Sequence, residues 1–310
     1  MSFWEGYWKT LKSREVEEPV DVWIHRPLAY LLALALRPTP ISPNLVTLGS
    51  ILLGLVALGV GFTSLEWRFQ IAALLIFCSA VFDCADGQLA RMRGTSSALG
   101  RMLDGSADLV VSAAMVIVGV WQVWGKYAEP WALIIALSVS VVAAVTSSFH
   151  TTIYDHFKNI YLRFTVPGFK EGESYAAARL RYESDPPPFF AARLAWPIYL
   201  FYVRSQEDTV KRYDPYTVTE MERLPAHDTE RAAIYRRHAL APMRLWRGFF
   251  GFGSLVFGVA VSVALGIPEW YMAVRLTLLN AIFYGYLRPL QREASRQALS
   301  EMQLDLGKAV

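Results

Sequence analysis

Residues 71–91 read IAALLIFCSAVFDCADGQLAR, and residues 100–121 read GRMLDGSADLVVSAAMVIVGVW. Each stretch joins a long apolar run to two aspartates, which are Asp83 and Asp86 in the first and Asp104 and Asp108 in the second. Carboxylates in or near lipid cost about 2.5–3.5 kcal/mol each on insertion scales. Four of them beside apolar runs of this length therefore indicate membrane helices that carry a binding site.

The composition is that of a membrane protein. Of 310 residues, 54% are apolar and only 18% are charged, whereas soluble domains have about 25% charged residues. Several apolar windows reach the roughly 20 residues that a helix needs to cross a bilayer. We therefore expect an all-α integral membrane protein without a nucleic-acid partner, whose six transmembrane helices lie over residues 44–63, 68–91, 100–124, 130–153, 246–266 and 270–288.

The distribution of Lys and Arg predicts the orientation of these helices. With the N-terminus in the cytoplasm, the outer loops contain only Arg68 and Lys126, and Arg275 lies within the last span. The remaining 27 of the 30 basic residues then face the cytoplasm or its interface, as the positive-inside rule requires. We expect a multi-pass protein of a bacterial inner membrane, with its active site facing the cytoplasm.

Two segments lie outside the expected spans. Residues 22–36 are short and amphipathic, and they predict an interfacial helix that lies on the membrane. Residues 154–245 predict a charged cytoplasmic insertion between the fourth and fifth spans. Its apolar part, 189–203, is too short for a seventh span and would export many arginines. The expected divisions of the chain are therefore 1–43, 44–153, 154–245 and 246–310.

The spacing of the aspartates places them on facing helices. Residues three or four apart share one helix face, so Asp83 and Asp86 share a face of the second span. Asp104 and Asp108 share a face of the third span in the same way. Because a short turn makes these spans antiparallel, we expect Asp86 level with Asp104 and Asp83 level with Asp108. Four carboxylates would then converge in one pocket.

Four uncompensated carboxylates would repel one another and stay protonated. Oxygen ligands favour Mg²⁺, Mn²⁺ or Ca²⁺ over zinc, and two ions roughly 3.5–4 Å apart can clamp both oxygens of a phosphoryl transfer. Gly87, Ala90 and Gly100 leave room for a bulky ligand, and Arg91 can pair with a phosphate.

Helix packing and ion transport account for the pattern less well. Packing with Asp–Arg pairs leaves two carboxylates without a role, although small residues at this spacing do serve packing. An acidic-site cation transporter is the better rival class, but it does not by itself need Gly and Arg at fixed offsets.

The full pattern runs Asp83-x₂-Asp86-Gly87-x₂-Ala90-Arg91-x₈-Gly100-x₃-Asp104-x₃-Asp108. It resembles the signature of the CDP-alcohol phosphotransferase (CDP-alcohol phosphatidyltransferase) family at all eight fixed positions, with the spacing of that family. The wider resemblance is a six-span architecture with an amphipathic N-terminal helix, from which the insertion over 154–245 departs.

The resemblance implies an enzyme in which an acceptor hydroxyl attacks the diphosphate of a CDP-linked donor and CMP leaves. Two Mg²⁺ or Mn²⁺ ions would be held by four carboxylates, those of Asp83, Asp86, Asp104 and Asp108. Asp108 would also take the proton of the acceptor. The nucleotide and its phosphates would contact Asn44, Thr47, Gly87, Ala90, Arg91, Ser97 and Gly100. Asn44 is equally well explained as a helix N-cap.

We therefore expect a membrane transferase of phospholipid synthesis, with a CDP-linked donor, a hydroxyl acceptor and membrane lipids as its partners. The composition of the chain is rich in alanine and arginine, as is typical of bacterial proteins, and this favours phosphatidyl transfer from CDP-diacylglycerol. A CDP-choline or CDP-ethanolamine donor with a diacylglycerol acceptor shares all of these residues and stays open, as does a homodimer. A catalytically dead scaffold is disfavoured because no motif position is missing.

Overall fold

The computed structural model describes residues 3–95, 98–169, 174–184, 190–224 and 227–308. Every regular element in these ranges is a helix, so the expected all-α class is confirmed for them. The chain divides into two compact units. The first comprises Met1–Ser147 with Phe252–Leu279, and the second comprises Ser148–Gly251 with Asn280–Val310.

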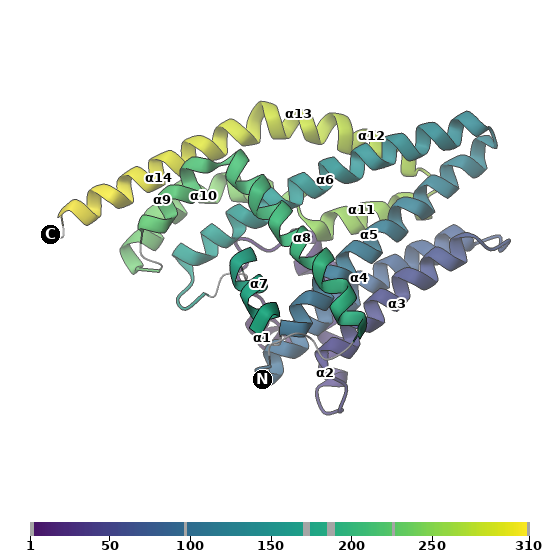
Figure 1. Cartoon of the computed structure of the whole chain (residues 1–310), viewed down its shortest axis with the longest axis horizontal. Helices are drawn as coiled ribbons and strands as arrows, with labels where there is room; N and C mark the ends of the chain where they lie inside the picture. Colours follow the sequence, from purple (N-terminus) through teal and green to yellow (C-terminus); the bar gives the residue numbers. More distant parts are fainter. Residues whose placement is uncertain (1–2, 96–97, 170–173, 185–189, 225–226, 309–310) are drawn as a thin grey trace. The chain divides into compact units, whose positions relative to one another are not determined.

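The first unit is a bundle around three long helices, which are α3 (Pro43–Gly61), α4 (Arg68–Arg93) and α5 (Ala98–Tyr127) (Figure 1). α6 begins in this unit at Pro130 and ends in the second unit at Thr165. The remaining elements of the first unit are α1 (Phe3–Lys9), the π-helical segment Asp21–His25, α2 (Arg26–Leu36), α11 (Phe252–Ala264), α12 (Pro268–Val274) and the π-helical segment Arg275–Leu279.

α3 begins at a side-chain cap. Ser42 Oγ accepts a hydrogen bond from Leu45 N at 3.3 Å, and Pro43 occupies the first turn, where its missing N–H leaves no donor unsatisfied. Asn44 lies inside this first turn. The assignment of Asn44 as the N-cap is therefore wrong, because Ser42 takes that role.

Gly94 ends α4 just after the motif arginine. Its φ of 65° is left-handed, a conformation that glycine adopts without steric cost. Gly94 N donates to Arg91 O at 3.3 Å, and Thr95 N donates to Ala90 O at 2.9 Å. These two bonds satisfy the last carbonyls of α4, so the helix stops here and the chain can turn towards α5.

Small residues on α3 bring it close to α5. A Cβ on Gly54 would lie 3.1 Å from Val111 Cγ2, and a Cβ on Gly61 would lie 3.3 Å from Val118 Cγ2. In both contacts the α5 residue follows the α3 residue by 57 positions. α3 and α5 are therefore parallel, with a fixed offset of 57 residues.

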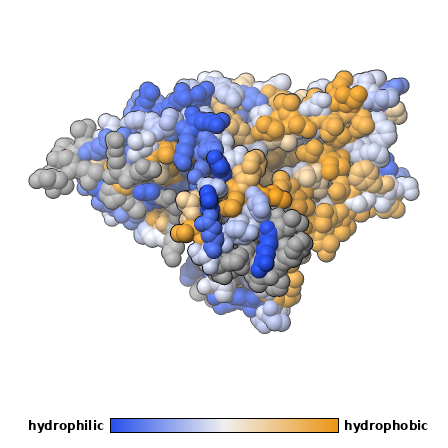
Figure 2. Space-filling view, viewed as in Figure 1, coloured by the Kyte–Doolittle hydropathy of each residue, from blue (hydrophilic) through white to orange (hydrophobic). Residues whose placement is uncertain are grey.

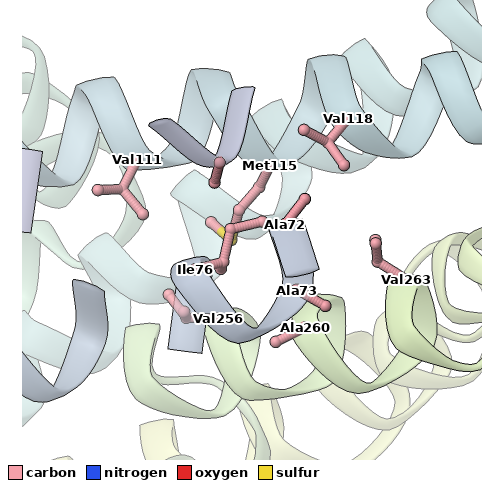
Figure 3. Close-up of a cluster of buried hydrophobic side chains, with 10 residues drawn as sticks. Ala72, Ala73, Ile76, Val111, Met115, Val118, Val256, Ala260 and Val263 are labelled. Atoms are coloured by element: carbon pink, nitrogen blue, oxygen red, sulfur yellow. The ribbon is translucent and has the colours of Figure 1, made fainter. Parts of the chain in front are cut away.

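The apolar core of the first unit joins α3, α4, α5 and α11. Figure 3 shows most of its side chains, which apart from Met115 are small or β-branched and so permit close helix packing. The buried members are Ala57, Ala72, Ala73, Ile76, Val111, Met115, Val118, Val256, Ala260 and Val263.

The second unit has an aromatic centre. The ring of Phe283 lies 4.6 Å from that of His150 and 5.7 Å from that of Trp246. Trp246 Nε1 donates to Gln291 Oε1 at 2.9 Å, which joins α10 to α14. The elements of this unit are the end of α6, α7 (Tyr175–Ser184), α8 (Phe190–Tyr213), α9 (Pro215–Arg223), α10 (Thr229–Phe249), α13 (Asn280–Ile282), the π-helical segment Phe283–Leu287 and α14 (Arg288–Lys308).

Within the described residues, five stretches are long and apolar enough to cross a membrane. They are Pro43–Gly61, Arg68–Arg93, Gly105–Tyr127, Pro130–Thr165 and Thr229–Ala264. These stretches overlap the first five expected spans, and Figure 2 shows hydrophobic side chains gathered over α3. Residues 270–288 are instead divided among several short helical segments. The count of six spans therefore stays a prediction.

The expected interfacial segment is helical and amphipathic. It consists of the π-helical turn Asp21–His25 followed by α2. Ala29 and Ala33 are buried, whereas Leu28 and Leu31 are 44% and 53% exposed. The exposed leucines suit contact with lipid, and the placement of this helix on the membrane surface stays a prediction.

Candidate active site on α3, α4 and α5

Thr47, Asp86 and the backbone of Asp104 lie at one level of the first bundle. Ser50 and Ser79 pair through their hydroxyls at 2.9 Å, and Thr47 pairs with Asp86 one turn away. α3 and α4 are therefore antiparallel. Because Asp104 follows Thr47 by the 57-residue offset between α3 and α5, its backbone is level with both Thr47 and Asp86. This agrees with the level expected from the sequence for Asp86 and Asp104.

Asp86 is held by a hydroxyl from α3. Thr47 is 3% exposed and Asp86 is 8% exposed. The Thr47 hydroxyl donates to Asp86 Oδ2, with Pro43 O as a more distant acceptor at 3.2 Å. A hydrogen bond to a carboxylate favours its charged form and fixes its orientation. Thr47, which the sequence assigned to nucleotide binding, thus contacts a motif carboxylate directly.

The other predicted site residues are described to different extents. Asp83 on α4 and Asp108 on α5 are half-buried, as are Asn44 and Gly100 in the first turns of their helices. The backbone of Asp104 is helical, but its side chain is not among those described. Ser97 lies outside the described residues. The convergence of all four carboxylates in one pocket therefore stays a prediction.

The motif has the donor chemistry of a site for a hard cation. Carboxylate oxygens suit Mg²⁺ and Mn²⁺, and the Thr47 hydroxyl already orients one of them at Asp86. Among the described side chains, which exclude that of Asp104, no group of three His, Cys, Asp or Glu residues is close enough to hold a metal ion. The fit to a metal site therefore rests on the residue types of the motif.

Arg91 lies along α4 with its guanidinium over Gly87. A Cβ on Gly87 would lie 3.4 Å from Arg91 Nη1, so the missing side chain leaves room for the guanidinium. Arg91 Nε donates to Thr10 O at 2.8 Å. Within the described part of the chain, this carbonyl is the one hydrogen-bond acceptor of Arg91. Nη1 and Nη2 can therefore serve an anionic ligand.

Sequence reasoning missed the contribution of the N-terminal segment. Gln88 is fully buried, and its Nε2 donates to Thr10 Oγ1 at 3.2 Å and to Arg26 O at 3.3 Å. Arg26 also pairs with Glu17 at 2.8 Å. The available signal was Gln88 itself, a polar residue three positions before Arg91 on the same helix face.

The Glu17–Arg26 pair keeps charge beside the motif helix. Burial alone lowers the pKa of the Arg26 guanidinium, but Glu17 together with Cys84, Asp21 and Tyr7 outweighs burial, so the pKa stands above its usual value. Arg26 is therefore charged at any physiological pH, and Glu17 balances that charge.

Comparison with known proteins assigns the motif to a family. The model of the CDP-alcohol phosphatidyltransferase family matches residues 40–202, which is more than half of the chain. The chain belongs to the CDP-alcohol phosphatidyltransferase family. The residues that match the family include the helices α3, α4, α5 and α6.

The family match also changes the interpretation of the expected insertion. It continues beyond residue 153 to residue 202, and α6 itself runs without a break to Thr165. The first part of 154–245 thus lies within the family match, whereas we expected that whole segment to depart from the family. The match ends before the fifth expected span, so it does not extend to the last two spans.

Curated relatives come from bacteria. The chain is 33% identical over 132 residues to a phosphatidylinositol phosphate synthase of Corynebacterium glutamicum, which covers 43% of this chain and 57% of the relative. It is 35% identical over 75 residues to a CDP-diacylglycerol–serine O-phosphatidyltransferase of Helicobacter pylori strain J99, covering 24% and 30%. The chain therefore spans about half or less of the length of the relatives that it matches.

Proposed function

We propose that this protein transfers a phosphatidyl group from CDP-diacylglycerol to the hydroxyl of a polar acceptor and releases CMP. The observation that carries the proposal is the complete eight-position motif on α4 and α5, with Asp86 held by Thr47 from α3. The Helicobacter relatives are CDP-diacylglycerol–serine O-phosphatidyltransferases, which supports CDP-diacylglycerol as the donor over CDP-choline or CDP-ethanolamine.

Four aspartates form the charged centre of the proposed site. Two Mg²⁺ or Mn²⁺ ions, when bound, neutralise the diphosphate and the CMP that leaves. The carboxylates proposed to hold them are those of Asp83, Asp86, Asp104 and Asp108. Thr47 orients Asp86 through its hydroxyl.

Asp108 is the proposed general base. It accepts the proton of the acceptor hydroxyl while the acceptor oxygen attacks the phosphorus that bears the diacylglycerol. The bond between this phosphorus and the bridging diphosphate oxygen breaks, and CMP leaves with the electron pair. The Nη atoms of Arg91 bind the diphosphate oxygens, and the nucleotide lies against Asn44, Thr47, Gly87, Ala90, Ser97 and Gly100.

The proposed site faces the cytoplasm of a bacterial inner membrane. The distribution of basic residues supports this orientation, and the curated relatives are bacterial. On this orientation the polar acceptor reaches the site from the cytoplasm, and CDP-diacylglycerol reaches it from the inner leaflet.

The test uses the full chain in liposomes with Mg²⁺ or Mn²⁺ and measures CMP by chromatography. One arm supplies CDP-diacylglycerol with serine, inositol phosphate or glycerol phosphate. The other arm supplies CDP-choline or CDP-ethanolamine with diacylglycerol. We expect metal-dependent release of CMP in the first arm alone. Release in the second arm alone would reverse the assigned donor, and cation flux without CMP release in either arm would assign a transporter.

A further inference from the structure

Thr10 in the N-terminal segment is hydrogen-bonded to two residues of the motif helix. Thr10 is 5% exposed and follows α1 directly. Its carbonyl accepts from Arg91 Nε at 2.8 Å, and its hydroxyl accepts from Gln88 Nε2 at 3.2 Å. The Thr10 hydroxyl in turn donates to Tyr7 O at 2.6 Å. Thr10 is therefore joined both to the arginine of the motif and to the buried glutamine beside it.

The segment before Thr10 is fixed to the rest of the first unit. Tyr7 is fully buried, and its hydroxyl donates to Val22 O at 2.5 Å. Its ring lies 5.8 Å from the ring of Tyr30 on α2. Burial raises the pKa of Tyr7 to about 12, so the hydroxyl keeps its proton and the hydrogen bond throughout the physiological range. α1 therefore has a defined place against α2.

The segment after Thr10 is fixed by two buried carboxylates. Glu17 pairs with Arg26 at 2.8 Å and accepts from Lys12 N at 3.2 Å. Glu18 accepts from Ser254 N at 2.7 Å and from Gly253 N at 3.1 Å, at the start of α11. A carboxylate at a helix N-terminus is favoured by the free amides and the helix dipole. Thr10 is thus held from both sides along the chain.

The consequence for Arg91 is a restricted side chain. A free arginine samples many rotamers, and ordering such a side chain on binding costs conformational entropy. Here Nε is already bonded to Thr10 O. The guanidinium lies over Gly87, with both Nη atoms free of other acceptors in the described part of the chain. A ligand therefore meets a guanidinium that is already oriented.

We infer that Thr10 and Gln88 are positioning residues for Arg91, and that the N-terminal segment Phe3–Glu18 thereby forms part of the nucleotide-diphosphate site. The Thr10 carbonyl is the acceptor for Arg91 Nε. Gln88 holds Thr10 beside α4, where this carbonyl can reach Arg91. The inference rests on the proposed function, since it assumes that Arg91 binds the diphosphate of the donor. It goes beyond the motif, which contains neither the N-terminal segment nor Gln88 as a fixed position.

The test compares variants that remove the Thr10 hydroxyl or the Gln88 side-chain amide with variants that keep both groups. Thr10→Val removes the hydroxyl that joins Thr10 to Gln88 and Tyr7, and Gln88→Leu removes the amide, both at similar volume. Both variants keep the Thr10 carbonyl, and Thr10→Ser also keeps the hydroxyl. Thr63→Val is the matched control, because it makes the same chemical change at an exposed threonine beyond the other end of α3. For each protein, KM and kcat for CDP-diacylglycerol, the dissociation constant of CDP with Mg²⁺, and the melting temperature are measured.

The expected pattern is a loss of donor affinity. Thr10→Val and Gln88→Leu raise KM for the donor and the CDP dissociation constant about fivefold to tenfold, as expected for a lost buried hydrogen bond, while kcat changes less than about twofold. Thr10→Ser and Thr63→Val match the wild type. In an Arg91→Lys background, Thr10→Val adds no further loss, because the bond to Nε is already absent.

Three results would overturn the inference or its premise. A lower melting temperature with unchanged KM and unchanged CDP affinity would make Thr10 and Gln88 anchors of the fold only. If the losses of CDP affinity caused by Thr10→Val and Arg91→Lys add fully in the double variant, Thr10 does not act through Arg91. This conclusion holds even if Thr10→Val folds poorly. If the wild type binds CDP but transfers no phosphatidyl group, the proposed function fails, and CDP binding by the same variants still decides the inference.

Discussion

The hydroxyl of Thr47 on α3 donates to the carboxylate of Asp86 on α4, between residues 39 positions apart in the chain. Both residues are buried. A motif aspartate is thus oriented by a helix that contains none of the eight signature positions. The relationship explains why α3 belongs to the site, since it brings a hydroxyl to the level at which α4 and α5 carry Asp86 and Asp104.

Removing this hydroxyl is expected to impair turnover. Thr47→Val keeps the shape of the side chain but loses a hydrogen bond to a charged group, which contributes about 1.5–3 kcal/mol. We expect kcat to fall roughly tenfold to a hundredfold and the Mg²⁺ concentration for half-maximal rate to rise, as measured by CMP release. Thr47→Ser is expected to retain most of the activity.

Ser50→Ala provides the control for Thr47. Ser50 also lies between α3 and α4, one turn along, but its partner is Ser79 and not a motif residue. We expect this variant to lower the melting temperature without changing the response to Mg²⁺. Equal effects of the two substitutions on that response would mean that the bond to Asp86 serves packing alone.

Gly87 is expected to tolerate a methyl group but not a larger side chain. A Cβ there would lie 3.4 Å from Arg91 Nη1, in ordinary contact, whereas the branches of valine would displace the guanidinium. Overpacking of this kind costs about 1–3 kcal/mol. Gly87→Ala should therefore change CDP affinity by less than about threefold, and Gly87→Val should weaken it about tenfold or more in equilibrium binding.

Gly59→Val is the matched change on α3, because a Cβ on Gly59 has no neighbour within 4 Å in the described structure. It should leave CDP affinity unchanged. A similar loss of CDP affinity in Gly59→Val would indicate a general effect of valine on the helix bundle. The loss in Gly87→Val could then not be attributed to displacement of the Arg91 guanidinium.

The sequence predicted most of the helices because long apolar runs are a local signal. Five of the six expected spans overlap stretches that are long and apolar enough to cross a membrane. The region of the sixth alternates between α-helical and π-helical turns around Arg275–Leu279 and Phe283–Leu287. Hydropathy averages over such changes in helical pitch, so it could not reveal them. The alternative interpretation of Asn44 as the cap of α3 is wrong, because Ser42 and Asn44 are both good caps and the structure uses Ser42.

The sequence could not predict the contacts that orient the site. The resemblance assigned Thr47 to the nucleotide, which stays a prediction, but its bond to Asp86 could not be predicted because the two residues lie on different helices. The bond from Arg91 to Thr10 joins residues 81 positions apart. The sequence pattern gave no role to Thr10, Glu17 and Glu18, although all three are buried in the first unit. Such pairings depend on tertiary packing, which local patterns do not encode.

Asp214 in the second unit gives a prediction on acid stability. It caps α9 by accepting from Thr217 N at 3.3 Å, and His156 Nε2 lies 3.7 Å from it. Burial raises the pKa of this carboxyl, but the nearby His156 ring and the hydrogen bond from Thr217 N together outweigh burial, so its pKa lies below the usual value of 3.8. A depressed pKa means that the stabilisation is present above pH 3.8 and is lost as the pH falls through the folded-state pKa.

Asp214→Asn should therefore have a lower melting temperature than the wild type at pH 7. The difference between the two melting temperatures should shrink as the pH falls below the usual carboxyl pKa. Thermal melts of the detergent-solubilised protein between pH 3 and pH 7 measure this. The control is Asp208→Asn, since Asp208 is exposed on α8 and its nearest cation, Arg204 Nε, is 3.9 Å away. A constant difference in melting temperature across this pH range would contradict the assigned pKa shift.

Asp108→Asn tests the base that the proposed function assigns. Asparagine keeps the size and an oxygen ligand but cannot accept the proton of the acceptor hydroxyl. Loss of a general base lowers rates roughly 10²- to 10⁴-fold, so CMP release should fall by that order while the melting temperature and CDP binding stay near wild-type values. Asp108→Glu should restore part of the rate because it restores a basic carboxylate. If the asparagine variant keeps near-wild-type turnover, the proton goes elsewhere and Asp108 serves the cation alone. If CDP binding falls together with turnover, the residue acts in holding the donor, and kcat at saturating donor distinguishes that role from proton transfer.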